Sequence, residues 1–519
     1  MFIEIYDTTL RDGTQSEGFT LSGPDKIRIA QRLDEFGVAY IEGGWPGSNP
    51  KDVEFFERAR DLEWHRAKIA AFGATCRVKG GPEDDANIKA LLDAKTPVVT
   101  IFGKTWGLHV TDVLNTTLDE NLRIIEQSVA YLKANGKYVI YDGEHTFDGY
   151  KADAAYAVET FRAALRGGAD MLALCDTNGG VMPWETAQIT RAYKAALGNA
   201  PLAIHTHNDS EVAVANALLA VQEGAVQVQG TINGVGERCG NSNLCSVIAN
   251  LELKMGHQCL PPGHLPQLYD VAHFILEVAN VTPDDHMAYV GKSAFAHKGG
   301  VHVTSMRRNE RSYQHVVPEL IGNRMRVVVS DLAGRGNILS KAEEYGLGQR
   351  DAAQVAEVLN DVKELEAQGF SFEAAEASVV LMLQRQQPNY VPPFTLIDFV
   401  TTVEHRQGRG MFAEATVKVR VGAEVLHTAA EGNGPVNALD SALRKALSGH
   451  YPAVNNFHLA DYKVRILDGA NGTAATTRVL IDTQSNTQRW STVGASANII
   501  EASWRALADA VEYGLTLAK

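Results

Sequence analysis

The chain has 519 residues and a formal net charge of −14, and its hydrophobic and charged fractions of 45% and 21% are those of an ordinary globular protein. A chain of this length exceeds one compact core, so we expect several domains. The negative charge argues against a nucleic-acid partner, and no apolar run is long enough to span a membrane. The start of the chain shows no secretory signal, and five scattered cysteines indicate neither a disulfide framework nor a thiolate zinc cluster, so we expect a cytoplasmic protein.

Short apolar runs alternate with amphipathic stretches from residue 1 to about 230. Eight runs separated by helical segments predict a (β/α)₈ barrel, and an open doubly wound sheet is the alternative, although no GxGxxG pattern follows the first run. The predicted strands are Phe2–Tyr6, Val38–Ile41, Lys68–Phe72, Val98–Phe102, Tyr138–Tyr141, Met171–Leu174, Leu202–Ile204 and Val226–Gln229. Predicted helices include Pro24–Phe36, Leu118–Asn135, Ala152–Arg166 and Val212–Glu223, with Asp119 and Ser210 as candidate caps.

Two histidines follow the seventh predicted strand, in the sequence His205-Thr206-His207. Side chains alternate along a strand, so both imidazoles point to the same side. The first, seventh and eighth strands become neighbours when a barrel closes, which brings Asp12 and Asn241 to the histidines. One carboxylate, two imidazoles and a nearby amide predict a site for a divalent metal, either magnesium, manganese or zinc. A hydrogen-bonded polar rim without a metal is the alternative interpretation.

Three motifs carry a resemblance that covers essentially the whole chain. They are the opening Asp-Thr-Thr-Leu-Arg-Asp-Gly at residues 7–13, the His-Thr-His-Asn-Asp at 205–209 and the Gly-Glu-Arg-Cys-Gly-Asn at 236–241. In this order they resemble the α-isopropylmalate, homocitrate and citramalate synthase family. Stretches 41–52 and 143–150 are most similar to the long citramalate synthases of that family. Hydroxymethylglutaryl-CoA lyases share the barrel and metal motif but lack the C-terminal third.

The resemblance implies an acyltransferase that acts as a homodimer. Its expected reaction is a Claisen-type condensation of acetyl-CoA with pyruvate, followed by thioester hydrolysis, which gives (R)-citramalate on a route to isoleucine. A 2-keto acid would chelate the metal through its carbonyl and carboxylate oxygens. Arg11 would then stabilise the developing alkoxide, Glu42 would orient Arg11, and Thr177 would bind the keto-acid carboxylate.

The acetyl-CoA methyl group needs a base, and the resemblance leaves two candidates, His302 and Glu144. Tyr313 would relay or donate a proton. In related synthases the linker supplies a histidine and a tyrosine to the active site of the partner subunit, and His302 and Tyr313 match those positions. Without the resemblance, a histidine beside the Gly299-Gly300 turn is more often structural.

Beyond the barrel the sequence predicts two further parts, so the expected domains are residues 1–275 (catalytic barrel), 276–389 (helical linker subdomains) and 390–519 (an α+β regulatory domain). Predicted helices in this region span 251–279, 338–345, 352–367 and 372–386. In the last part, Asn437 and Arg444 recur 61 positions later as Asn498 and Arg505. This recurrence predicts two related β-rich units, each backed by a helix.

The last part is predicted to bind a feedback effector, which the family resemblance identifies as isoleucine. Glycine-rich turns next to strand ends offer backbone N–H groups for a carboxylate, an acidic side chain could meet the ammonium group, and apolar residues could hold the side chain. A purely structural dimerisation module is the alternative. The candidate effector residues are Asp468, Gly469, Ala474, Val493 and Ile499.

Other functions stay open from the sequence. A 2-isopropylmalate or homocitrate synthase would use a larger 2-keto acid. A metal-dependent hydrolase on the same barrel carries its HxH motif on the first strand, where this chain has Asp12. A non-haem iron oxygenase also uses two histidines and a carboxylate, though usually on an all-β fold. An amino-acid sensor without activity is the remaining alternative.

Overall fold

The computed structural model describes residues 1–348, 350–408, 410–486 and 488–518. The chain forms two compact units, one of Met1–Phe295 with Val316–Arg324 and one of Ala296–His315 with Met325–Lys519. The domain boundaries expected near residues 275 and 389 stay predictions. Within the described ranges, no helix combines the length and the apolar character needed to cross a membrane.

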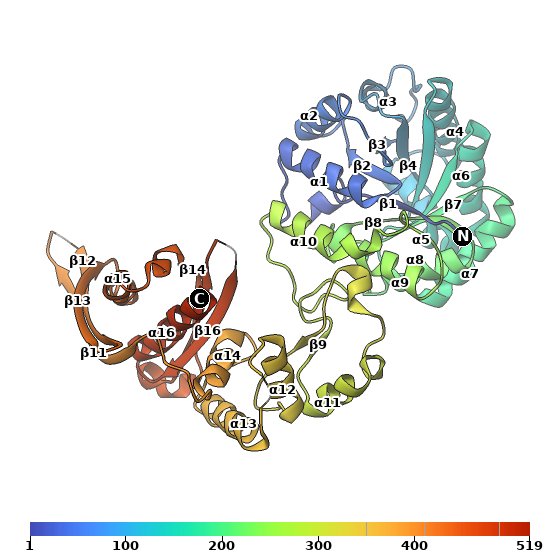
Figure 1. The fold of residues 1–519 in the computed structure, drawn as a ribbon. Helices are drawn as coiled ribbons and strands as arrows, with labels where there is room; N and C mark the ends of the chain where they lie inside the picture. Colours follow the sequence, from blue (N-terminus) through green and yellow to red (C-terminus); the bar gives the residue numbers. More distant parts are fainter. Residues whose placement is uncertain (349, 409, 487, 519) are drawn as a thin grey trace. The chain divides into compact units, whose positions relative to one another are not determined.

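The first unit contains the predicted barrel. Eight parallel strands pair in sequence order, and β8 pairs with β1 to close the sheet (Figure 1). The strands are β1 (Glu4–Asp7), β2 (Tyr40–Gly44), β3 (Lys68–Ala74), β4 (Val98–Lys104), β5 (Tyr138–Glu144), β6 (Met171–Asp176), β7 (Leu202–Thr206) and β8 (Ala225–Gly230).

Most strands run two or three residues further toward their carboxyl ends than the apolar runs predicted. Lys104 still pairs with Glu144, and Asp176 still pairs with Thr206. The prediction stopped too early because the barrel interior turns polar at this end, while the backbone ladder continues. His205 is therefore a strand residue and does not lie in the following loop.

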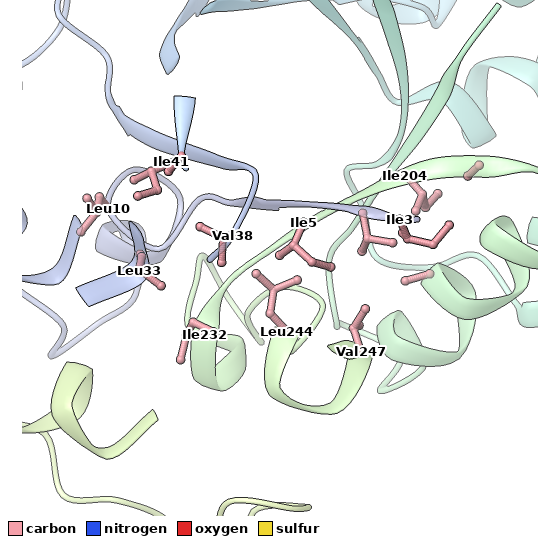
Figure 2. Close-up of a cluster of buried hydrophobic side chains, with 14 of the residues drawn as sticks. Ile3, Ile5, Leu10, Leu33, Val38, Ile41, Ile204, Ile232, Leu244 and Val247 are labelled. Atoms are coloured by element: carbon pink, nitrogen blue, oxygen red, sulfur yellow. The ribbon is translucent and has the colours of Figure 1, made fainter. Parts of the chain in front are cut away.

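Two apolar cores flank the barrel strands, and Figure 2 shows part of the larger one, which lies between the strands and the surrounding helices. Its fully buried side chains include Ile5 of β1 and Ile204 of β7; burial of such a residue contributes about 1.5–3 kcal/mol. The smaller core fills the interior with Tyr6, Tyr40, Ala70, Val98, Ile140, Met171, Ala173, Cys175 and Ala203. Two residues further along their strands, Glu42, Asp142 and His205 face the same interior. The interior at the carboxyl end of the barrel is thus polar, because these side chains alternate onto the same face as the apolar interior residues.

Ten α-helices of the first unit follow the strands (Figure 1). Thr117 caps α4 by accepting the Glu120 N–H, so the predicted cap at Asp119 is wrong. Ser210 is not a cap either, because α8 begins after Val212. The helix predicted over 251–279 is divided into α9 and α10: α9 ends at Leu253, shortly before Gly256 with φ +70°, and α10 begins only after the Pro261-Pro262 pair. The helices are α1 (Gly23–Phe36), α2 (Pro50–Ala59), α3 (Ala86–Asp93), α4 (Leu118–Ala134), α5 (Thr146–Ala152), α6 (Ala154–Gly167), α7 (Pro183–Leu197), α8 (Ala213–Gln222), α9 (Leu244–Leu253) and α10 (Leu268–Val278).

The second unit begins with a helical part. A parallel pair of short strands, β9 (Ala296–His297) and β10 (Arg326–Val327), lies on either side of its first helix in the sequence. A Cβ on Gly300 would lie 2.7 Å from the Gly334 Cα, so glycine permits the start of α11 to lie against the start of α12. The helices are α11 (Gly300–Arg308), α12 (Arg335–Glu344), α13 (Ala352–Ala367) and α14 (Glu376–Arg385).

The C-terminal part has the predicted repeat of two β-rich modules, each backed by a helix. Both sheets have three antiparallel strands, and one apolar core joins the two modules. The ion pairs Arg444–Asp440 and Arg505–Glu501 recur at equivalent positions of the two helices. The first module comprises β11 (Thr395–Arg406), β12 (Gly410–Val421), β13 (Glu424–Gly432) and α15 (Pro435–Leu447), and the second comprises β14 (His458–Ile466), β15 (Thr477–Gln484), β16 (Arg489–Ser496) and α16 (Ile499–Leu517).

Candidate metal centre

Asp12, His205 and His207 converge at the carboxyl end of the barrel. All three are buried, and their ligand atoms lie within 4.8 Å of one another. Asp12 Oδ2 lies 3.2 Å from His205 Nε2 and 3.9 Å from His207 Nε2. The Asn241 amide donates to the same carboxylate oxygen at 3.1 Å. The structure therefore brings together the four residues that the sequence grouped around a metal.

A glycine-rich loop positions the amide of Asn241. A Cβ on Gly236 would lie 1.8 Å from Asn241 Oδ1, so any other residue there would displace the amide. Gly240 has φ +90°, and its Cβ would meet the Gly234 carbonyl oxygen at 2.0 Å. These two glycines explain why the loop after β8 can fold back to the metal centre.

The donor set fits a divalent cation. Asp12 Oδ1 and Asn241 Oδ1 are buried oxygen atoms without a hydrogen-bond partner in the described part of the chain. Burial opposes ionisation of Asp12, but the nearby positive charge, above all that of the Arg11 guanidinium, holds the pKa of this carboxyl well below its usual range. Burial lowers the pKa of His207 to about 4, which leaves its imidazole neutral at pH 7. A carboxylate, a neutral imidazole and unpaired oxygen atoms are suitable ligands for a divalent cation.

His205 is oriented by a chain of polar side chains inside the barrel. Its Nδ1 lies 3.0 Å from Gln229 Oε1, and the Gln229 amide donates to Asp142 Oδ1 at 3.2 Å. Because Gln229 Oε1 can only accept, His205 carries its proton on Nδ1 and directs the Nε2 lone pair at the metal centre. The sequence reading missed Gln229 and Asp142; the signal available was the alternation of glutamine and valine along the eighth apolar run.

Glu42 lies against Arg11, the residue that it is predicted to orient. The Arg11 Nε donates to Glu42 Oε2 at 2.6 Å, while Tyr6 and Thr8 donate to the same carboxylate at 2.7 and 2.5 Å. The guanidinium of Arg11 lies 3.8 Å from the centre of the Phe72 ring, and its Nη1 is 3.4 Å from Asp12 Oδ2. Arg11 is thus fixed between a carboxylate and an aromatic ring, next to the metal ligands.

Glu144 and Thr177 lie at the carboxyl ends of two neighbouring strands, β5 and β6. Glu144 is the last residue of β5 and forms an ion pair with Lys104 of β4, a partner that the sequence reading did not identify. The Thr177 hydroxyl accepts the His145 backbone N–H at 2.9 Å. The hydroxyl proton of Thr177 can therefore still be donated to an anionic group.

His302 and Tyr313 belong to the second unit, whereas the metal centre belongs to the first. Their rings stack with centroids 4.1 Å apart and an interplanar angle of 23°. Both side chains are exposed, and Tyr313 is 45% exposed. The two residues thus form one exposed aromatic pair.

The candidate effector residues have different surroundings. The Asp468 carboxylate is occupied by its own turn, accepting from the Thr476 N–H and the Asn471 amide at 2.7 and 2.6 Å. Gly469 and Ala474 are the two ends of the following short helix. Val493 is 1% exposed in a core with the preceding helices, while Ile499 is 44% exposed.

Comparison with known proteins now identifies the family. The HMGL-like family matches residues 2–275, the homocitrate synthase post-HMGL domain-like family matches 289–369, and the LeuA allosteric (dimerisation) domain matches 373–515. The (R)-citramalate synthase of Geobacter sulfurreducens is 54% identical over 99% of this chain and 97% of its own length. The chain belongs to the (R)-citramalate synthase family. Citramalate synthases of Synechocystis sp. and Aquifex aeolicus are 50% and 49% identical, each over 99% of this chain and 96% and 98% of their own lengths. The similarity to citramalate synthases thus includes the barrel, the linker and the C-terminal modules.

The contact between Gln229 and His205 leads to a prediction. Gln229→Leu should weaken metal binding about 10–100-fold, because His205 loses the acceptor that fixes its proton and its ring. Calorimetric titration of the protein with manganese measures the affinity for the metal directly. Gln227→Leu is the matched control, since Gln227 lies two residues earlier on the same strand face and donates to Glu4. Equal losses in both variants would refute the role of Gln229.

Proposed function

We propose that the chain catalyses the Claisen-type condensation of acetyl-CoA with pyruvate and the hydrolysis of the resulting thioester, releasing (R)-citramalate and CoA. The observation that carries this proposal is the position of Arg11 beside the buried Asp12–His205–His207 cluster, in a chain similar to citramalate synthases from end to end. We further propose that the protein acts as a cytoplasmic homodimer.

The divalent ion, magnesium, manganese or zinc, would be held by Asp12, His205 and His207, with the Asn241 amide beside them. When bound, it supplies positive charge that stabilises the oxyanion formed from the keto group. The protein contributes the remaining interactions. Arg11 donates to the same oxygen as its negative charge develops, and Glu42 keeps the guanidinium in this position. The Thr177 hydroxyl donates to the carboxylate of the keto acid.

Carbon–carbon bond formation requires removal of a proton from the acetyl-CoA methyl group. We assign this step to His302, with Tyr313 stacked on its ring as the proton donor or relay, and keep Glu144 as the alternative base. The ion pair with Lys104 already engages the Glu144 carboxylate, which favours His302. Proton exchange of the acetyl methyl group with solvent, measured in the His302→Asn and Glu144→Gln variants, distinguishes the two.

A panel of 2-keto acids tests the reaction. CoA release should have its highest kcat/KM with pyruvate. The 2-ketobutyrate value should be lower by about 10–200-fold, because one methylene group changes transition-state binding by only ~1–3 kcal/mol. A higher kcat/KM with 2-ketoisovalerate or 2-ketoglutarate would change the assignment to 2-isopropylmalate or homocitrate synthase, and absence of CoA release with all of them would refute a condensing enzyme.

We also propose that the C-terminal modules bind isoleucine and that binding inhibits the barrel. The match of residues 373–515 to the LeuA allosteric (dimerisation) domain supports an allosteric role. Inhibition requires tighter binding of isoleucine to the less active conformation. Calorimetry should detect saturable binding of isoleucine to the full-length protein, tighter than that of leucine or valine. Absence of binding by any of the three would leave the modules a structural role only.

A further inference from the structure

Three arginines surround a hollow of about 580 Å³ in the helical part of the second unit. Arg335 and Leu339 lie on one face of α12, Arg307 comes from α11, and Arg350 follows the turn after α12. Such a volume is typical of sites for small organic ligands. The hollow is separate from the residues assigned to the metal centre and to the condensation reaction.

The wall of the hollow carries a carboxylate partner for only one of the three arginines. Arg307 forms a two-pronged ion pair with Glu343 at 2.7 and 2.8 Å, and Glu343 is the one carboxylate on the wall. Arg335 is exposed, and no ion pair involving it occurs among the described residues. The wall therefore carries three guanidinium groups and one carboxylate, an excess of two positive charges.

Arg350 supplies an independent indication of a ligand. Its side chain is 9% exposed, and its Nη2 donates to the Leu383 carbonyl oxygen at 3.0 Å. Its Nε is buried without a hydrogen-bond partner in the described ranges. A buried charged donor left unpaired is costly, so Arg350, which lines the hollow, has a guanidinium that is only partly satisfied within the described ranges.

Two glycines also line the hollow. Gly346 and Gly348 have φ +63° and +76°, and a Cβ on either would meet no atom within 4 Å. The backbone there leaves space next to the arginines. Guanidinium groups pair with phosphate oxygens in a two-pronged geometry, and a phosphate ester carries up to two negative charges, which match the excess of two positive charges on the wall.

We propose that this hollow, defined by Arg307, Arg335 and Arg350, binds a phosphate ester of nucleotide size. Its volume exceeds what one phosphate group needs, and Leu339 provides an apolar surface for the organic part of the ligand. Two sources share this chemistry: the adenosine 3′,5′-bisphosphate end of a coenzyme A thioester, and a free adenine nucleotide. The site lies outside the proposed catalytic machinery, and binding to it can be measured without turnover.

Calorimetry on the full-length protein tests the proposal with adenosine 3′,5′-bisphosphate, AMP and inorganic phosphate at constant ionic strength. At least one ester should bind saturably and more tightly than inorganic phosphate. Tighter binding of the bisphosphate identifies the coenzyme A end, whereas equal or tighter binding of AMP identifies a free nucleotide. Binding of no ester, or of esters no more tightly than inorganic phosphate, would overturn the proposal.

The matched variants are Arg335→Gln and Arg308→Gln, which remove the same charge. Arg335 lines the hollow, whereas Arg308 is exposed on α11 and does not line it. Arg335→Gln should weaken ester binding about tenfold or more, and Arg308→Gln should change it less than twofold. Arg307→Gln provides a second loss of a wall charge. Equal effects of Arg335→Gln and Arg308→Gln would mean that general charge attraction accounts for the binding, and would also overturn the proposal.

Discussion

His207→Ala should remove most of the bound divalent metal and lower kcat/KM for citramalate formation by on the order of a thousandfold or more. His207 is one of two imidazoles in the buried cluster, and its low pKa makes it a neutral ligand across the physiological pH range. Without it, the two remaining ligands of the cluster bind a cation less tightly. Elemental analysis of the purified protein and a CoA-release assay measure the two losses together.

The control for this variant is His286→Ala, because His286 lies in the first unit but its side chain is 86% exposed. Metal content and activity should both stay at the wild-type level there. Dialysis of the wild-type protein against a chelator should reproduce the His207→Ala result, and adding back magnesium, manganese or zinc should reverse it. Full activity after verified removal of the metal would refute the metal requirement.

Arg11→Ala should lower kcat by about 10²–10³-fold, since it removes a charged donor to the developing oxyanion. His302→Ala should also be inactive if His302 is the base. We expect His302 to act in the barrel of a partner subunit, so a mixed dimer of these two variants contains one intact site. A 1:1 mixture after subunit exchange should recover about one quarter of wild-type activity, because half of the dimers are mixed and each has one working site of two.

The matched control for complementation is a mixture of Arg11→Ala and His207→Ala chains. Each change lies in the barrel of its own chain, so every site in such a dimer contains one of them. This mixture should recover no activity. If it recovers as much as the Arg11→Ala and His302→Ala mixture, or if verified mixed dimers of the latter pair stay inactive, His302 does not act across subunits.

The barrel could be predicted from the sequence because each strand begins with a buried apolar run. The polar ends of the strands could not be predicted, because Glu42, Glu144 and Asp176 interrupt the apolar pattern. Their backbones nevertheless continue the ladder of hydrogen bonds between strands. Strand β11 could not be predicted from the sequence either. Its side chains are mostly exposed, its register shifts between Leu396 and Asp398, and neither feature produces a buried alternating pattern.

The clustering of Asp12, His205 and His207 could be predicted because barrel closure fixes which strand ends are neighbours. The supporting residues could not be assigned in the same way. Gln229 contacts His205, but the side-chain alternation that indicates this contact is a weak signal in a strand of only six residues. Lys104 meets Glu144 only because of the register between β4 and β5. The proposed effector site depended on turn composition. The structure instead engages Asp468 within its own turn, a local contact that composition does not reveal.

The hydrogen bond between Asp12 and Asn241 joins residues 229 positions apart, across the seam where β8 meets β1. The metal centre therefore cannot assemble on a nascent or partly folded chain until the last strand has added to the first, a contact with a large loop-closure entropy. A cation that binds the native state and not the open sheet would stabilise the closed seam by about 2.7 kcal/mol at a concentration 100 times its Kd. In this fold the proposed ion would therefore also be a folding ligand that selects the completed barrel.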